Sequence, residues 1–182
     1  MKKLITFFII LLILGAGFLA WLIMGPSTGF KEEFKYLYIS SNNPTKDSIL
    51  KIINRDSITW HEATFEKVAD RMDYWRHIKP GKYKIEKGSS VLSVVRKLKN
   101  GQQEPVNLVI LKFRTKEALA GAMGKKLECD SASLLAFMND KDSMGKYGLD
   151  SNTAMSILFP NTYTLNWNTT PRKVFNKFYE EH

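Results

Sequence analysis

The chain has 182 residues, of which 44% are hydrophobic and 25% are charged. This balance is typical of a folded protein with one ordinary domain or two small ones, and it excludes an intrinsically disordered chain. A single cysteine, Cys129, cannot form a disulfide within the chain, so a disulfide-rich secreted scaffold is also excluded.

The first predicted element is an apolar helix. No charged residue occurs between Leu4 and Met24, and a helix of this length would be about 30 Å long, the thickness of a bilayer core. The alternative is a cleavable signal peptide, whose apolar region is usually about 7–15 residues long. Because this run is longer and carries Trp21 where a membrane interface favours aromatic rings, we expect residues 1–24 to be an uncleaved transmembrane anchor.

Charge predicts the orientation of this anchor and the kind of partner. Lys2 and Lys3 precede the apolar run, and the positive-inside rule keeps them in the cytoplasm. We therefore expect a single-pass protein of the inner (plasma) membrane with its bulk in the periplasm. The chain has 27 Lys and Arg and 18 Asp and Glu, so the positive residues still exceed the negative ones by seven when these two lysines are left out. Such a surplus favours anionic lipid or cell-wall polymer, or it is a merely solvated basic surface; nucleic acid is not an expected partner at this location.

The next segment reads as a linker followed by a small β-α-α-β module. Gly25 to Gly29 is rich in residues that break regular structure, so we assign residues 25–33 to a linker. Alternating apolar and polar residues predict strands, and apolar residues at helical spacing predict helices. These patterns place the module at residues 34–87, with a strand, two helices and a second strand over residues 34–40, 46–55, about 60–77 and 82–86.

Residues 88–182 are expected to contain helices and one further strand. N-cap residues and a proline at a first helical position mark the helix starts, and β-branched residues mark the strand. The stretch from Gly145 to Asn152 reads as a loop. We predict helices that begin after Ser89 or Ser90, at Thr115, at Ser131 or Ser133 and at Thr170–Pro171, and a strand over residues 106–111. The predicted fold class is therefore α+β.

The last predicted helix has an apolar face made of Val174, Phe175 and Phe178. Burying such side chains is worth roughly 1.5–3 kcal/mol each, and the sequence shows no obvious partner for them after this helix. We expect this face to be exposed.

Aromatic and amide residues gather between positions 159 and 167 and form the candidate binding site. The rings of Tyr163 and Trp167 can stack on sugars, and the amides of Asn161 and Asn166 can pair with hydroxyl or N-acetyl groups. The alternative is that Phe159 and Tyr163 belong to the core and that the Pro-Asn pair forms a turn. Each residue taken alone fits this alternative at least as well.

Catalytic and metal-binding patterns are weak. His61, His77 and His182 have no ligand spacing with a second donor, so no metal site and no cofactor are expected. A glycosidase acid needs a partly apolar setting that raises its pKa. The candidate acids instead lie in polar loop-like segments or near the chain end, so we expect no catalytic acid among Asp140, Asp142, Asp150, Glu180 and Glu181.

Two segments carry a family resemblance: "GKYKIEKGSSVLSVVRKLKNGQQEPVNLVI" at residues 81–110 and "LFPNTYTLNWNTTP" at residues 158–171. With the N-terminal apolar helix before them, they resemble the endolytic murein transglycosylase family, also called YceG-like. The family pattern has Glu-Gly where this chain has Met155-Ser156, and Asp where it has Asn161.

The resemblance implies a fold and an activity. It makes residues 34–87 a LysM-like module and residues 88–182 the first part of a transglycosylase domain. The implied activity is cleavage of MurNAc–GlcNAc bonds in nascent peptidoglycan glycan strands. In this reaction one glutamate serves as acid and then base, and an anhydro ring forms without a cofactor.

The resemblance also assigns the site. It places the substrate contacts at Phe159, Asn161, Tyr163 and Trp167, and the catalytic glutamate downstream of His182, so we expect no catalytic residue in this chain and no activity of the chain alone. Two alternatives remain: a non-enzymatic peptidoglycan-binding protein, and an interaction partner of cell-wall synthesis or division proteins.

Overall fold

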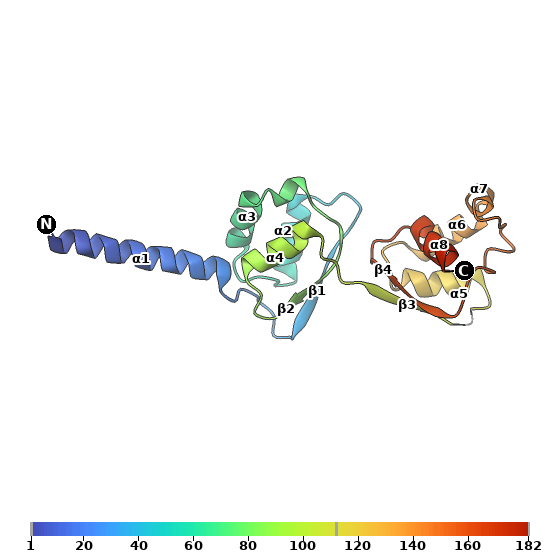
Figure 1. The fold of residues 1–182 in the computed structure, drawn as a ribbon, viewed down its shortest axis with the longest axis horizontal. Helices are drawn as coiled ribbons and strands as arrows, with labels where there is room; N and C mark the ends of the chain where they lie inside the picture. Colours follow the sequence, from blue (N-terminus) through green and yellow to red (C-terminus); the bar gives the residue numbers. More distant parts are fainter. Residues whose placement is uncertain (1, 112, 182) are drawn as a thin grey trace. The chain divides into compact units, whose positions relative to one another are not determined.

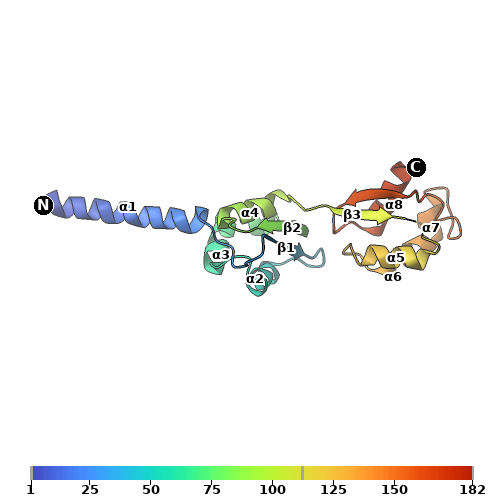
Figure 2. The ribbon, with the colours of Figure 1, turned by 90° about the horizontal axis from the view of Figure 1, so that it is seen from below.

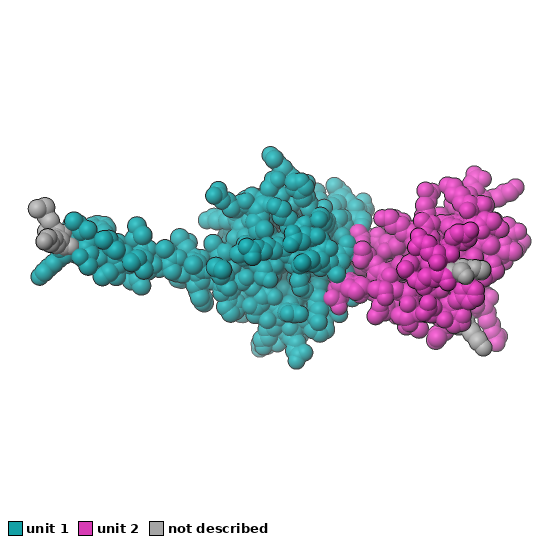
Figure 3. Space-filling view, viewed as in Figure 1, with its two compact units in different colours: residues 1–103 teal, residues 104–182 magenta. Residues whose placement is uncertain are grey.

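The computed structural model describes residues 2–111 and 113–181. The chain divides into two compact units, residues 1–103 and residues 104–182 (Figure 3). Each unit has its own hydrophobic core, and both combine helices with a two-stranded antiparallel sheet. The predicted α+β class is confirmed.

The first unit begins with α1 (Lys2–Met24), the long helix at the N-terminus in Figure 1. Its side chains from Lys3 to Trp21 are all exposed, and by length and composition alone the segment Lys3–Met24 can cross a membrane, with a mean hydropathy of 2.7. The backbone N–H of Gly25 donates to the carbonyl of Trp21 at 2.7 Å and closes the last turn. This apolar, exposed helix is consistent with a single-pass anchor or a signal sequence.

The remainder of the first unit has the predicted β-α-α-β order, extended by one more helix. Strands β1 and β2 pair antiparallel, with Leu37 opposite Tyr83, and alternate residues of both strands point into the core. The elements are β1 (Phe34–Ile39), α2 (Lys46–Arg55), α3 (Glu62–Arg71), the short 3-10 helix η1 (Tyr74–Arg76), β2 (Gly81–Glu86) and α4 (Val91–Asn100).

Local signals explain where these helices begin and end. Thr45 caps α2 in a reciprocal capping box with Ser48, and α2 has the predicted bounds. The helix predicted over residues 60–77 is shorter: α3 ends at Arg71, and Asp73 adopts a left-handed conformation with φ 53°. Such a residue cannot continue a right-handed helix, so the chain restarts as η1.

Helix α4 belongs to the first unit, whereas the sequence analysis started the second domain at residue 88. Four α4 side chains are buried in the first core: Val91, Val94, Val95 and Leu98. The helix ends at Gly101, whose φ of 69° favours glycine. The boundary between the units therefore lies between Gln103 and Glu104, because the first core needs α4 to cover it.

Two tyrosines are buried in this core, and they differ in whether the hydroxyl group has a hydrogen-bond partner. The hydroxyl of Tyr83 donates to the carbonyl of Lys79 at 2.6 Å, and burial raises the pKa of Tyr83 to about 12. The hydroxyl of Tyr74 is also buried but has no hydrogen-bond partner among the described residues, and burial raises the pKa of Tyr74 as well.

We therefore predict opposite effects of two matched substitutions. Tyr83→Phe should lower the free energy of unfolding of the first unit by about 1 kcal/mol, because it removes a satisfied hydrogen bond. Tyr74→Phe should raise the free energy of unfolding by about 1 kcal/mol, because it removes a buried hydroxyl that lacks a partner. Urea unfolding of the full chain in detergent, followed by amide hydrogen exchange in β1 and β2, measures both. If both variants lowered the free energy of unfolding equally, the difference in hydrogen bonding between the two hydroxyl groups would be contradicted.

The second unit pairs β3 with β4 and covers one side of the pair with helices. Leu108 of β3 lies opposite Tyr163 of β4, and Figure 2 shows α8 beside the two strands. Asp130 caps α6 in place of the predicted serines, and α7 was not predicted. The elements are β3 (Val106–Ile110), α5 (Lys116–Gly124), α6 (Ser131–Asn139), α7 (Lys141–Gly145), β4 (Asn161–Leu165) and α8 (Pro171–Glu180).

The expectation that the apolar face of α8 is exposed was wrong. Val174, Phe175 and Phe178 are fully buried. The ring of Phe178 packs edge-on against Tyr163 of β4, with ring centroids 4.7 Å apart, and Phe175 contacts Phe137 of α6 at 5.3 Å. The partners of α8 therefore precede it in the chain.

Candidate functional site

The predicted site residues occur at both ends of β4 and do not form one cluster. Phe159 and Asn161 lie at the start of the strand and Trp167 lies beyond its end. A strand of this length spans roughly 17 Å. The structure therefore separates Phe159 and Trp167, which the sequence analysis had grouped together.

Tyr163, in the middle of β4, is a core residue. Its side chain is fully buried, and its hydroxyl donates to the carbonyl of Phe159 at 3.2 Å. Burial raises the pKa of this phenol. In this conformation the ring has no face open to a sugar, so the stacking role expected for Tyr163 does not fit its position. The side chain instead packs in the core of the second unit.

The start of β4 keeps two accessible candidates. The side chain of Phe159 is 45% exposed. Asn161 is exposed, and its amide nitrogen donates to Oε2 of Glu181 at 3.1 Å. A cavity of about 250 Å³ adjoins this end and is lined by Leu111, Phe113, Arg114, Met155, Leu158 and Pro160.

The other end of β4 leads into a polar groove. Trp167 is half-buried against the core, and its carbonyl accepts a hydrogen bond from the N–H of Glu128 at 2.8 Å. The groove lies between this end of β4, the turn that follows and one face of α8, and it has a volume of about 360 Å³. It is lined by Pro105, Thr164, Leu165, Asn166, Thr169, Lys173, Asn176, Lys177 and Glu180; we call this set the α8 groove.

Hydrogen bonds hold several polar groups of the α8 groove in place. The hydroxyl of Tyr147 donates to Oδ1 of Asn176 at 2.5 Å, which fixes the orientation of that amide. The hydroxyl of Thr169 donates to the carbonyl of Asn166 at 2.6 Å. Lys177 pairs with Glu181 at 2.9 Å, and this carboxylate raises the lysine pKa. The groove thus presents oriented amide and hydroxyl groups beside ammonium groups.

The sequence analysis named Asn166 but missed the residues that α8 contributes. Lys173, Asn176, Lys177 and Glu180 repeat at three- and four-residue spacing, so they share one side of the helix. That polar stripe was visible beside the apolar stripe of the same helix.

Three aspartates of the second unit accept hydrogen bonds that stabilise helix starts or a turn. The backbone and side chain of Ser133 donate to Asp130 and lower its pKa, and Ser143 does the same for Asp140. The pKa of Asp150 is lowered by hydrogen bonds from Thr153 and Asn152. A carboxyl group held ionised in this way is a poor general acid, because it does not carry the proton that the leaving oxygen needs.

No three His, Cys, Asp or Glu side chains in the described part of the chain are grouped as metal ligands. His61 and His77 are exposed residues of the first unit, and His182, the third histidine considered as a ligand, lies outside the described residues.

Comparison with known proteins assigns the chain to a family. Residues 37–182 match the YceG-like family, which covers both units from within β1 onward. The chain belongs to the YceG-like family. This confirms the resemblance that the segments at residues 81–110 and 158–171 carry. YceG-like proteins are generally lytic transglycosylases that act on peptidoglycan.

One solved structure and the curated proteins complete the comparison. A putative YceG-like protein from Listeria monocytogenes aligns with 83% of this YceG-like chain at 15% sequence identity and a TM-score of 0.44. The alignment covers 54% of that protein's chain, so this chain spans about half of its length. No curated protein matches the sequence.

Proposed function

We propose that this YceG-like protein is a membrane-anchored part of an endolytic transglycosylase that acts on nascent peptidoglycan glycan strands at the periplasmic face of the inner membrane. The family assignment of residues 37–182 is the observation that carries this proposal. The apolar helix α1 and the basic surplus of the remaining chain support it.

The chemistry of the α8 groove supports a glycan ligand. Peptidoglycan sugars carry hydroxyl and N-acetyl groups, and the peptides attached to muramic acid carry carboxylates. The amides of Asn166 and Asn176 suit the first set of groups, and the ammonium group of Lys173 suits the carboxylates. Because a glycan strand is a long polymer, it can also contact Phe159 and Asn161 at the other end of β4 through a different sugar.

We infer that the groove binds and orients the strand and that the proton-transferring glutamate is not among the described residues. The carboxylates of Asp130, Asp140 and Asp150 are held ionised, and Glu180 lies on the exposed face of α8. The reaction implied by the family needs one carboxyl group that gives a proton to the leaving oxygen and regains one from the attacking hydroxyl.

The first test is an activity assay of the full 182-residue chain on nascent glycan strands, with mass spectrometry of the products. We expect no anhydro-ended product above the control without protein. If such products formed, and if Asp150→Asn or Glu180→Gln abolished them, the proposal that this chain binds the strand without cleaving it would be contradicted.

The second test measures binding to purified sacculi. Lys173→Gln should weaken binding by about threefold to tenfold, because it removes one charge-assisted contact from a partly exposed site. Lys125→Gln, which alters an exposed lysine outside the α8 groove, is the matched control and should bind like the unaltered chain. Equal binding by both variants would remove the groove from the proposed site.

A second candidate function, peptidoglycan binding by the module at residues 34–87 without catalysis, is favoured by the outer face of β1 and β2. Phe34, Tyr36 and Tyr38 follow one another on this face. The ammonium groups of Lys82 and Lys84 lie over the rings of Tyr36 and Phe34, 3.8 and 4.5 Å from the ring centroids. We propose that this row is LysM-like in function. Saturable binding of chitin oligomers by the full chain, lost on Tyr36→Ala, would support it.

A further inference from the structure

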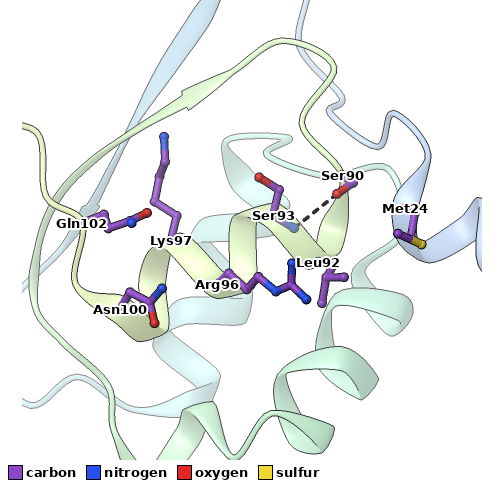
Figure 4. Close-up of a pocket in the computed structure, with 8 residues that line it drawn as sticks. All are labelled: Met24, Ser90, Leu92, Ser93, Arg96, Lys97, Asn100 and Gln102. Atoms are coloured by element: carbon purple, nitrogen blue, oxygen red, sulfur yellow. Dashed lines mark hydrogen bonds between the residues drawn. The ribbon is translucent and has the colours of Figure 1, made fainter.

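A second polar cavity lies in the first unit, at the end of α1. It has a volume of about 340 Å³ and runs along the exposed side of α4 (Figure 4). Its lining includes Met24, the last residue of α1, together with Leu92, Ser93, Arg96 and Lys97 of α4. We call it the α4 pocket. Neither the α8 groove nor the aromatic face of β1 and β2 includes any of these residues.

The position of Met24 relates the α4 pocket to a membrane surface. If α1 spans the bilayer, its last residues lie at the membrane–water interface, and Trp21, which is 58% exposed, fits the aromatic belt there. Met24 and Leu92 line the same cavity. The pocket therefore opens at the depth of the lipid headgroups.

The lining changes from apolar to cationic along α4. Leu92 and Arg96 are four residues apart, so they are neighbours on one side of the helix. In Figure 4 the Arg96 side chain runs back along α4 toward Leu92, the direction that helical side chains generally take. The Ser93 N–H, also drawn in Figure 4, donates to Oγ of the cap residue Ser90 at 3.2 Å. An apolar patch thus adjoins a cation within about one helical turn.

The positive charge of the α4 pocket is not neutralised by the protein. No Asp or Glu lines the pocket, and within the described ranges Arg96 forms no ion pair. Lys97 donates one hydrogen bond to the carbonyl of Lys84 at 2.8 Å, which holds the ammonium group in place and leaves two further N–H donors. In Figure 4 the Lys97 side chain extends away from Arg96, so Arg96 is the cation beside the apolar end of the pocket. A guanidinium group without a carboxylate partner is suited to an anionic group such as phosphate.

We propose that the α4 pocket binds the phosphate headgroup of an anionic phospholipid. Arg96 binds the phosphate, Met24 and Leu92 contact the glycerol and the first acyl carbons, and Lys97 adds positive charge to the same pocket. The inference rests on the part of the proposed function that makes α1 a membrane anchor, and it is independent of peptidoglycan binding. The bound lipid would hold the first unit against the membrane surface.

Native mass spectrometry of the full chain in detergent tests the proposal. The protein is titrated with phosphatidylglycerol or with phosphatidylcholine of the same acyl chains. We expect phosphatidylglycerol to bind at least about tenfold more tightly than phosphatidylcholine, and Arg96→Gln to weaken phosphatidylglycerol about tenfold, the effect of losing one charge-assisted hydrogen bond. Arg96→Lys should retain most of the preference. Arg71→Gln, at an exposed arginine of α3 outside the pocket, is the matched control and should change nothing.

Four binding results would overturn the proposal. They are equal affinity for both lipids, an Arg96→Gln variant that binds like the unaltered chain, full competition by soluble glycerol phosphate, and displacement of the lipid by soluble peptidoglycan fragments. An intact mass that lacks residues 1–24 would also overturn it, because Met24 would then be absent. Sacculus binding measured on the same variants keeps the two proposals distinct: Arg96→Gln should leave it unchanged.

Discussion

Phe178→Ala is expected to lower the free energy of unfolding of the second unit by roughly 3–5 kcal/mol, the usual cost of truncating a fully buried phenylalanine. The Phe178 ring is buried on all sides. It contacts Tyr163 at 4.7 Å and Phe175 at 5.8 Å between ring centroids, in edge-to-face geometry. The substitution therefore opens a cavity and removes two aromatic contacts. Urea unfolding of the full chain in detergent, followed by amide hydrogen exchange in β3 and β4, measures the loss.

Tyr179→Ala is the matched control on the same helix. Tyr179 is 52% exposed, and its ring contacts Tyr147 at 5.5 Å between ring centroids. One partly exposed aromatic pair contributes about 0.5–1.5 kcal/mol, so this variant should lose no more than that. Similar losses for Phe178→Ala and Tyr179→Ala would contradict the packing of α8 against β4.

The same packing links stability to the proposed binding site. The apolar side of α8 holds the helix on β4, and its polar side supplies Lys173 and Asn176 to the α8 groove. A loss of packing at Phe178 should therefore disorder the groove as well. We expect Phe178→Ala to weaken binding to sacculi even though Phe178 does not line the groove.

The elements that the sequence predicted well are those with local signals. Ser90 and Thr115 each accept a hydrogen bond from a backbone N–H at the start of their helix, as their residue types led us to expect. The strand predicted over residues 106–111 also formed, one residue shorter, because alternation of buried and exposed residues is visible in the sequence itself.

The expectations that failed depended on contacts between distant segments. Tyr163 and Trp167 look alike as candidate sugar-stacking rings, but Tyr163 is buried because α8 brings Phe178 over it. The boundary between the units lies after Gln103 and not at residue 88, because the α4 side chains Val94 and Val95 complete the first core. Nothing near these residues in the sequence specifies such partners.

The candidate site also combines residues that the sequence suggested with residues that it did not. Asn166 lines the α8 groove as an amide suited to sugars. Phe159 is accessible at the other end of β4. Its neighbours in the sequence do not indicate whether it is exposed or part of the core. The groove itself arises only when α8 packs against β4, so its lysines could not be assigned to a site from spacing alone.

The second large effect concerns the membrane anchor. In a fusion protein with a reporter enzyme after His182, active only outside the cytoplasm, we expect full reporter activity for the natural sequence. Replacing both Leu11 and Leu14 by arginine should abolish it. Both side chains are exposed near the middle of α1, and an arginine at the centre of a membrane helix costs about 2.5–3.5 kcal/mol. Two such residues on neighbouring turns therefore remove most of the driving force for insertion.

The matched control replaces the same two leucines by valine, which keeps the helix apolar and should leave reporter activity unchanged. Because a signal peptide would also fail with two arginines, the intact mass of the membrane-bound protein distinguishes it from an anchor. We expect a mass that includes residues 1–24 and full extraction by detergent but not by high salt, since burial of an apolar helix in lipid does not depend on ionic strength. Reporter activity in the cytoplasm, or a soluble form cut near Gly25, would show that α1 does not anchor the protein.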